Sequence, residues 1–288
     1  MDRQTEPERL APSQLTLHFM ADGQRRTWLD YQNVAYPFHV GRCLSLPDDP
    51  AGMATVYVQS CSGGIFEGDR LQWQIQARKG AQAHVTTAAS TIVHGMEQGD
   101  SQQTILLDVH EGALLEYLPE ASILFPGAQL SNRVCVRWHP TATVLLWDTV
   151  LSHDPQADDS VGPGRWFRNY RSELSVTDAD GRLLARDRYT MSGNALAQGL
   201  PGLIGGHTCQ ASFALLHSGV DAALKKRLRD ILHADKTVYA GVSDLPNGCG
   251  VFVRLLARDA AELRIVSNET WAACRESLLG VRPGLRRK

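Results

Sequence analysis

The chain has 288 residues, of which 43% are hydrophobic and 21% charged, and its formal net charge is -2. These are the proportions of a globular protein large enough to bury a core without disulfide or metal support. The near-neutral charge excludes the basic surface of a general nucleic-acid-binding protein. No apolar run approaches the roughly 18 residues of a membrane span. We therefore expect neither a nucleic-acid partner nor a membrane partner.

The six cysteines are scattered, and no two of them form a Cys-x-x-Cys pair. In a chain of this size, such isolated thiols indicate a reducing compartment rather than a disulfide scaffold. The first 14 residues are polar and lack the apolar segment of a signal peptide. We expect a disordered arm over residues 1–14 and a cytoplasmic location.

Short strands separated by turns account for the first half of the chain. Leu15 to Phe19 alternates apolar and polar residues and is followed by Asp22-Gly23, which predicts a β-hairpin. The segment 54–59 predicts a strand that leads into a glycine loop at 62–70. Gly-Ala pairs at 80–81, 112–113 and 127–128 then precede further apolar runs. Because glycine reaches backbone angles that strain other residues, each pair predicts a turn between strands.

The second half adds two helices. Apolar runs at 134–138 and 143–147 predict strands, and Asp178 to Gly181 predicts a second hairpin. An apolar stripe of helical period predicts an amphipathic helix over 220–234. Another helix is predicted over 269–279, with Asn268 as its start and Gly280 as its stop. No linker divides the chain, so we expect one mainly β domain over 15–280, in which stacked, solenoid-like sheets carry about two helices near the C-terminus. A basic tail at 281–288 follows.

Patterns that would support catalysis are weak. The glycine loop has Asp69 where a phosphate-binding loop would have lysine. The sequence contains no Gly-x-Ser-x-Gly elbow and no His-Glu-x-x-His pair. Asp69 is either a turn residue that bonds to backbone amides or a polar group that faces an internal passage. An acid/base hydrolase that uses Glu116, Glu120 or Asp69 remains an alternative.

The segment around Glu116, Tyr117, Leu118 and Phe125 is unusually apolar for one that contains turns. It is either part of the core or an exposed surface that docks another protein. The sequence leaves both interpretations open, and these four residues are our candidates for partner binding.

An ordered series of motifs resembles the UreD (UreH) family of urease accessory proteins. The series includes Ser62-Gly63-Gly64 … Gly68-Asp69-Arg70-Leu71, Thr86-Thr87-Ala88-Ala89-Ser90-Thr91, Gly112-Ala113-Leu114-Leu115-Glu116-Tyr117-Leu118-Pro119-Glu120 and Leu145-Leu146-Trp147-Asp148. The resemblance implies a stacked, helicoidal β fold and a non-catalytic role as a scaffold in nickel delivery to urease. It implies UreF-like and UreG-like (GTPase) accessory proteins and urease apoprotein as partners. Departures from the family pattern at 151–167 and in the tail indicate a divergent member.

The resemblance also implies site residues. The family's proposed nickel path is an internal polar tunnel, and the positions that match its polar residues are Asp69, Thr91, Asp148 and Asp187. Nickel would be in transit, with no stably bound cofactor or metal, because a passage needs several weak stations rather than one tight cage. A further alternative is a β-solenoid protein-binding module without a metal role.

Overall fold

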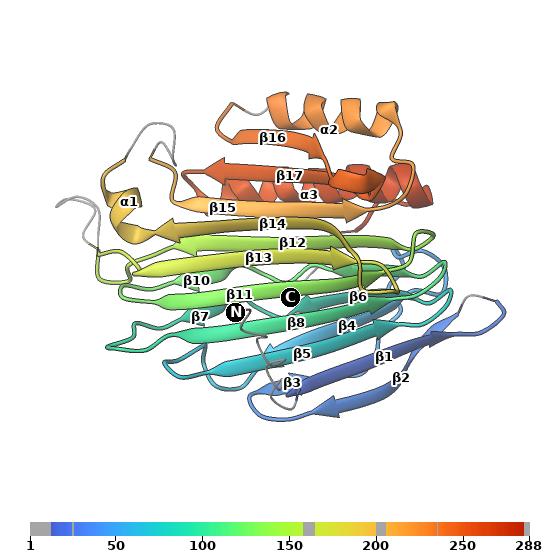
Figure 1. The fold of residues 1–288 in the computed structure, drawn as a ribbon, viewed down its shortest axis with the longest axis horizontal. Coiled ribbons are helices and arrows are strands. Elements are labelled where there is room, and N and C mark those ends of the chain that lie inside the picture. Colours follow the sequence, from blue (N-terminus) through green and yellow to red (C-terminus); the bar gives the residue numbers. More distant parts are fainter. Residues whose placement is uncertain (1–12, 25, 158–164, 200–205, 235, 285–288) are drawn as a thin grey trace, which may run out of the picture.

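The strands form two sheets that face one another (Figure 1). The computed structural model describes residues 13–24, 26–157, 165–199, 206–234 and 236–284. The seven-stranded sheet has the order β14 (Leu183–Ser192), β13 (Asn169–Thr177), β11 (Gln129–Trp138), β8 (Ser101–Val109), β5 (Arg70–Ala77), β1 (Leu15–Ala21) and β2 (Thr27–Val34). The ten-stranded sheet has the order β16 (Tyr239–Asp244), β17 (Gly250–Ala257), β15 (Cys209–Leu216), β12 (Thr143–Ser152), β9 (Leu114–Tyr117), β6 (Gln82–Thr87), β4 (Ala54–Ser60) and β3 (Phe38–Val40), with β10 (Ser122–Leu124) and β7 (Thr91–Val93) attached beside β12.

The central strands are the stacked coils of a β-solenoid. Strands β4, β6, β9 and β12 run parallel and side by side in one sheet. Strands β5, β8, β11 and β13 do the same in the other sheet. The chain crosses between the sheets as it goes from β4 to β5, from β6 to β8, from β9 to β11 and from β12 to β13. This gives about three solenoid turns, and the predicted mainly β, solenoid-like fold is confirmed.

The Gly-Ala pairs at 80–81 and 112–113 form one corner of the coils, and the pair at 127–128 lies at the crossing in the opposite direction, between β10 and β11. Gly80 and Gly112 have φ angles of 70° and 62°, in the region that glycine adopts without strain. The alanines that follow, Ala81 and Ala113, are 0% and 2% exposed. The N–H of Leu114 donates to the carbonyl of Ala81 at 2.8 Å, so that one turn stacks directly on the next. Neighbouring strands lie only about 4.8 Å apart, and a small buried side chain suits this close stacking.

Both predicted hairpins are present. Strands β1 and β2 pair antiparallel, as do β13 and β14. The Asp22 carboxylate accepts hydrogen bonds from the N–H groups of Gln24 and Arg26, each at 2.9 Å. The Asp178 carboxylate accepts from the N–H of Arg182, also at 2.9 Å. An aspartate that bonds to nearby backbone amides holds each turn.

Three α-helices occur in the described part of the chain. Helix α1 (Gly193–Ala197) is a short turn after β14, and a 3-10 turn, η1 (Pro246–Gly248), precedes β17. Helix α2 (Ala222–Ala234) matches its predicted position. Helix α3 (Ala260–Leu279) packs against β15 and β17, and α2 packs against α3 and β16. No helix in these ranges is long and apolar enough to cross a membrane.

The predicted start of the last helix is wrong. Helix α3 begins at Ala260, where the Asp259 carboxylate accepts hydrogen bonds from the N–H groups of Ala261 at 2.6 Å and Glu262 at 3.3 Å. Asn268 lies inside the helix. The predicted stop is confirmed, because Gly280 has a φ of 68° at the helix end.

The predicted terminal segments are only partly described. Residues 1–12 of the arm and 285–288 of the tail lie outside the described residues. Within the described part, Ser13 Oγ donates to the Gln72 carbonyl at 3.0 Å. Arg282 of the tail forms an ion pair with Glu269 at 2.6 Å.

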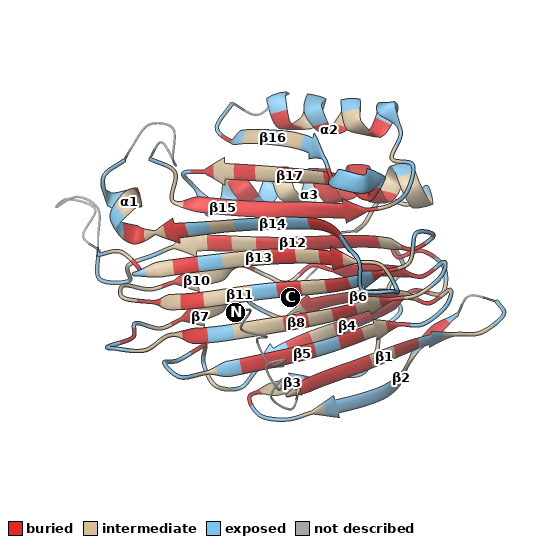
Figure 2. Ribbon diagram, viewed as in Figure 1, coloured by how far each residue is buried: buried red, intermediate tan, exposed pale blue. Residues whose placement is uncertain are grey.

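The core has two interfaces, one between the sheets and one between the ten-stranded sheet and the helices. Every residue of β15 is buried, because one of its faces meets the opposite sheet and the other meets the helices (Figure 2). The space between the sheets contains two separate apolar clusters rather than one.

The position of the N-cap can be tested by mutation. Asp259→Ala should lower the free energy of unfolding by about 1 kcal/mol, because it leaves the first amides of α3 without their acceptor. The control Asn268→Ala should have little effect, since Asn268 is not a cap. Chemical denaturation of both variants measures this, and a larger loss for Asn268→Ala would contradict the assignment.

Candidate functional site: a polar layer and pocket between the sheets

A layer of polar side chains separates the two apolar clusters between the sheets. On β12, for example, Asp148 occupies the inward position between Leu146 of one cluster and Val150 of the other. Neighbouring strands have polar residues at the same level. Those that pair in register are Gln103, Asn132, Ser172 and Tyr189 on the seven-stranded sheet, and Asp148, Ser212 and Arg254 on the ten-stranded sheet. We call this set the polar layer. Burying polar groups costs free energy unless they are hydrogen-bonded. Apolar packing alone therefore does not explain why polar residues occur at this level.

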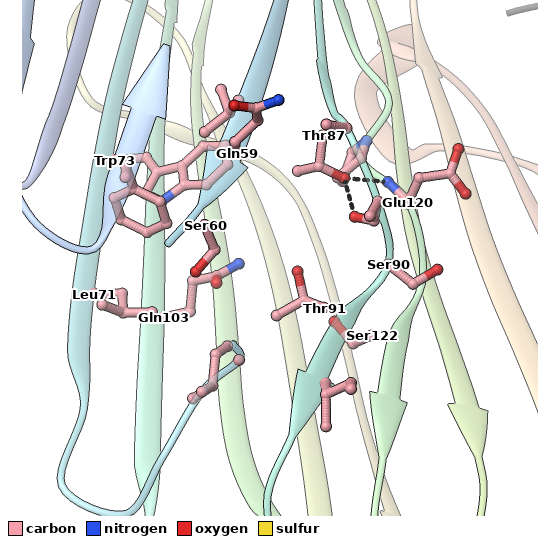
Figure 3. Close-up of a pocket in the computed structure, with 18 of the residues that line it drawn as sticks. Gln59, Ser60, Leu71, Trp73, Thr87, Ser90, Thr91, Gln103, Glu120 and Ser122 are labelled. Atoms are coloured by element: carbon pink, nitrogen blue, oxygen red, sulfur yellow. Dashed lines mark hydrogen bonds between the residues drawn. The ribbon is translucent and has the colours of Figure 1, made fainter. Parts of the chain in front are cut away.

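A pocket of approximately 390 Å³ opens onto the polar layer. Its walls come from both sheets: Leu71, Trp73 and Gln103 lie on one side, and Thr87, Thr91 and Ser122 lie on the other (Figure 3). The mouth is formed by exposed residues at 59–61 and 89–90. The inner end is formed by residues of the polar layer and by Thr149. The pocket therefore leads from the surface to the buried carboxylate of Asp148.

The carboxylate of Asp148 accepts four hydrogen bonds. Its Oδ1 accepts from the Tyr170 hydroxyl at 2.6 Å and from Asn132 Nδ2 at 3.2 Å. Its Oδ2 accepts from Ser172 Oγ at 2.6 Å and from the Tyr189 hydroxyl at 3.0 Å. All four donors belong to the seven-stranded sheet, so this one side chain ties the two sheets together. Burial, followed by the charge of Asp148, raises the pKa of both tyrosines well above the ordinary value, which keeps them protonated as donors.

Asp187 lies on β14, two residues before Tyr189 and on the same inward face. Its Oδ2 is 2.6 Å from Arg254 Nη2. Burial raises the pKa of the Asp187 carboxyl, Arg254 opposes this rise, and the charge of Asp148 adds to it. The two carboxylates are therefore close enough to influence one another.

The structure brings together three of the four residues that the family resemblance implied. Thr91 and Asp148 line the pocket, and Asp187 lies just beyond its inner end. Asp69 lies elsewhere, in the glycine loop, where its carboxylate accepts the N–H of Phe66 at 2.8 Å. This is the turn interpretation of Asp69, and the residue does not line the pocket.

In the part of the chain that the structure describes, no three side chains of His, Cys, Asp or Glu come together in a way that could hold a metal ion. The pocket instead offers separate oxygen atoms along its walls, from hydroxyls, amides and the Asp148 carboxylate. Such groups suit weak contacts with a hydrated cation at several points.

A family model described as UreD urease accessory protein matches residues 11–288. Urease accessory protein UreD 1 of Pseudomonas syringae pv. syringae (strain B728a) is 43% identical over 263 residues, which cover 91% of this chain and 90% of the relative. Urease accessory protein UreD 1 of Methylorubrum extorquens (strain PA1) is 38% identical, covering 93% of this chain and 89% of the relative. The chain belongs to the UreD family. UreD proteins are accessory proteins rather than enzymes.

The hydrolase alternative gains no support from the geometry of this UreD chain. Glu116 and Leu118 face the helices, on the opposite side of the ten-stranded sheet from the pocket. Glu120 lines the pocket. The two carboxylates therefore do not converge on a common site as an acid and base pair would have to.

Glu116 belongs to a fully buried charge network beneath α3. Its carboxylate accepts hydrogen bonds from Arg275 Nε at 2.9 Å, Arg275 Nη2 at 3.0 Å and Trp271 Nε1 at 3.1 Å, and His84 Nδ1 lies 2.7 Å away. Arg275 is 0% exposed and also pairs with Asp49 at 3.0 Å. Burial acts to raise the pKa of Glu116, but His84 and Arg275 together outweigh it and hold the pKa below its ordinary value.

The residues predicted for partner binding divide between interior and surface. Glu116, Tyr117 and Leu118 are buried, which corresponds to the core interpretation that the sequence left open. A partner would reach them only if the chain rearranged. Phe125 is partly exposed at a corner of the solenoid.

Several functional candidates could not be predicted from the sequence. Asn132, Tyr189, Ser212 and Arg254 carry no local signal, because they come to one level only through the pairing of strands that are far apart in the sequence. Arg275 was also missed, although it follows Trp271 by one helical turn and so lies on the apolar side of α3. A charged residue on the buried stripe of a helix was the available signal for Arg275.

Breaking the buried network should destabilise the chain strongly. Glu116→Gln leaves the buried Arg275 partly unpaired and should lower the free energy of unfolding at pH 7 by about 3 to 5 kcal/mol. Because the pKa of Glu116 is held below its ordinary value of about 4.3, the stabilisation from its charge exists above that pH and is lost as the pH falls through the lower, folded-state value. The difference between variant and wild type should therefore shrink in acid.

Urea denaturation from pH 7 down to about pH 2 measures this effect, because the loss occurs below the unfolded-state pKa of Glu116. Glu111→Gln is a matched control, since Glu111 forms an exposed pair with Lys79 and should leave stability nearly unchanged. Equal effects of the two substitutions at pH 7 would refute the role given to the network.

Proposed function

We propose that this UreD-family chain serves urease maturation as a non-catalytic scaffold and metallochaperone that passes nickel through the pocket between its sheets. The observation that carries the proposal is a pocket that leads from an exposed mouth to the buried, charged Asp148. The relatives compared above are named urease accessory proteins, which supports a role in urease maturation.

The hydrogen bonding of Asp148 suits transit better than storage. A carboxylate has about four lone-pair sites, and here four donors use them. A cation can bind Asp148 only by exchanging with a donor, which makes the contact weak and reversible. Beside it, Asn132 Oδ1 is buried without a hydrogen-bond partner among the described residues, and it adds an oxygen ligand at the inner end of the pocket.

Partners of the proposed scaffold are a UreF-like protein, a UreG-like GTPase and urease apoprotein, in the cytoplasm.

Four aromatic rings in contact at one solenoid corner, which we call the ring ladder, form a surface for one of these partners. Phe66 stacks on His94 at 4.3 Å between ring centroids, and Phe125 lies 5.8 Å from both His94 and His153. The rings come from successive coils, whose strands pair in register just before them. Aromatic surface of this kind is typical of protein interfaces.

The charge of Asp148 provides the test of nickel transfer. Asp148→Asn should reduce nickel-dependent urease activation at least about tenfold, because the passage loses its anionic station, while the variant still co-purifies with its partners. Ser172→Ala removes one donor but keeps the charge, and it should activate nearly as well as wild type. Urease activity in cells that rely on the variant chain measures both.

Normal activation by Asp148→Asn would contradict nickel transfer through this pocket and favour the β-solenoid binding module without a metal role. Equal losses of urease activation for Asp148→Asn and Ser172→Ala would indicate that activation depends on the hydrogen bonds between the sheets rather than on the charge of Asp148. Thermal unfolding of both variants shows whether that tie has been weakened.

The ring ladder can be tested separately. Phe125→Ala removes the ring that joins the two histidines and should weaken co-purification with a UreF-like partner roughly tenfold or more, as expected for an aromatic anchor. Tyr239→Ala is the control, because Tyr239 is 73% exposed but lies on β16, away from the ladder. Unchanged recovery of the partner with Phe125→Ala would exclude this surface.

A further inference from the structure

A stack of side chains closes the inner end of the pocket. The Tyr189 hydroxyl donates to Asp148 at the end of the pocket. The guanidinium of Arg254 lies over the Tyr189 ring, 4.7 Å from its centroid, and 5.4 Å from the centroid of Phe252. Arg254 Nη2 is 2.6 Å from Asp187 Oδ2. From the inner end of the pocket towards the sheet edge, the order is therefore Asp148, Tyr189, Arg254 and Asp187.

The far side of this stack reaches solvent. The side chains of Arg254 and Asp187 are 36% and 27% exposed, whereas Asp148 is 9% exposed. Asp187 lies on β14, which is the edge strand of the seven-stranded sheet. Arg254 and Asp187 thus lie between the buried end of the pocket and the solvent at this edge of the seven-stranded sheet.

Without the guanidinium of Arg254, the two carboxylates of the stack would balance the charge of one divalent cation. Asp148 and Asp187 supply the two carboxylates of the stack. Arg254 supplies one positive charge, in contact with Asp187 and over the Tyr189 ring whose hydroxyl bonds to Asp148. Arginine does not lose its proton in proteins, so this positive charge is permanent. In effect, the guanidinium occupies the place where a cation would be held.

The polar layer beside the stack is not saturated with hydrogen bonds. Ser212 pairs in register with both Asp148 and Arg254, is 4% exposed, and its Oγ has no partner among the described residues. Arg254 Nε is likewise buried without a partner within the described ranges. Unpaired buried polar atoms are rare in folded proteins, and their presence between two carboxylates points to a polar ligand at this level.

We infer that Arg254 is a tethered counter-ion that closes the inner end of the passage, and that a divalent cation moves beyond Asp148 only by displacing the guanidinium from Asp187. The inference rests on the proposed nickel transfer and names the residue that controls it. The rings of Tyr189 and Phe252 support the guanidinium when it leaves Asp187, since cation–π contacts persist without the ion pair. Arg254 acts here as a positioning residue, because its charge decides where the cation stops.

Equilibrium Ni²⁺ binding to the purified full-length chain tests this role. Arg254→Met keeps an apolar side chain over the rings and removes the charge, so it should tighten Ni²⁺ binding at least about tenfold. Arg254→Lys keeps a positive charge and should bind like wild type. Arg254→Met combined with Asp187→Asn removes both charges of the pair and should return the affinity toward the wild-type value. Arg254→Gln repeats the charge removal should the Met variant fail to fold.

Arg188→Met is the matched control. Arg188 also lies on β14 but pairs with Glu173, 3.2 Å away, instead of Asp187. An equal gain in affinity for Arg188→Met would mean that overall charge explains the effect, and it would overturn the inference. Unchanged affinity for Arg254→Met and Arg254→Gln, or a gain for Arg254→Lys, would overturn it as well.

The outcome separates this inference from the proposed function. If Asp148→Asn abolishes urease activation but Arg254→Met binds Ni²⁺ like wild type, nickel transfer stands and the counter-ion role fails. If Arg254→Met binds Ni²⁺ tightly but Asp148→Asn activates urease normally, the ion site exists and nickel transfer through it fails.

Discussion

The in-register stacking of the solenoid coils is the constraint on which the site depends. Parallel pairing fixes the level of each strand against its neighbour, so residues separated by a whole coil come to lie side by side. Gln103, Asn132 and Ser172 come together in this way on one sheet. On the other sheet, the antiparallel strand β15 places Ser212 beside Asp148 at the same level. A shift of one residue would turn each of these side chains to the opposite face of its sheet. The polar layer is therefore a property of the register and not of any single strand.

The polar layer is stable because its buried charge is well solvated by protein donors. Short hydrogen bonds to a carboxylate are stronger than those between neutral groups, and Asp148 has two of 2.6 Å. Apolar clusters on either side supply the hydrophobic stabilisation that the layer itself does not. The second buried charge, on Glu116, is handled differently: Arg275 compensates it directly and fixes α3 on the sheet. One carboxylate joins the sheets around a pocket, and the other joins a helix to the sheet with no pocket between them.

Local sequence signals predicted the fold. Most of the site could not be predicted, because it is formed by residues that are far apart in the sequence. The Gly-Ala pairs, the Asp-Gly hairpin turns and the apolar stripe of α2 act within a few residues, so they could be read directly. The start of α3 was missed because Asn268-Glu269-Thr270 resembles a cap, whereas Thr270 is buried and its Oγ1 donates to the Val266 carbonyl one turn earlier. Arg254 could not be found because nearly every other residue of β17 is apolar, so no polar–apolar alternation in the sequence shows which face of the strand Arg254 is on. Thr91, Asp148 and Asp187 came from the family resemblance alone.

The buried network beneath α3 also determines when the chain can finish folding. Arg275 bonds to the carbonyl of Asp48, 227 positions earlier, and to Glu116, 159 positions earlier. Closing such long loops is slow, and contacts of this range order the chain late. During synthesis from the N-terminus, the coils emerge well before the helix that neutralises the Glu116 carboxylate. The nascent solenoid must therefore wait for α3 to leave the ribosome, with an apolar sheet face and the Glu116 carboxylate still open to water.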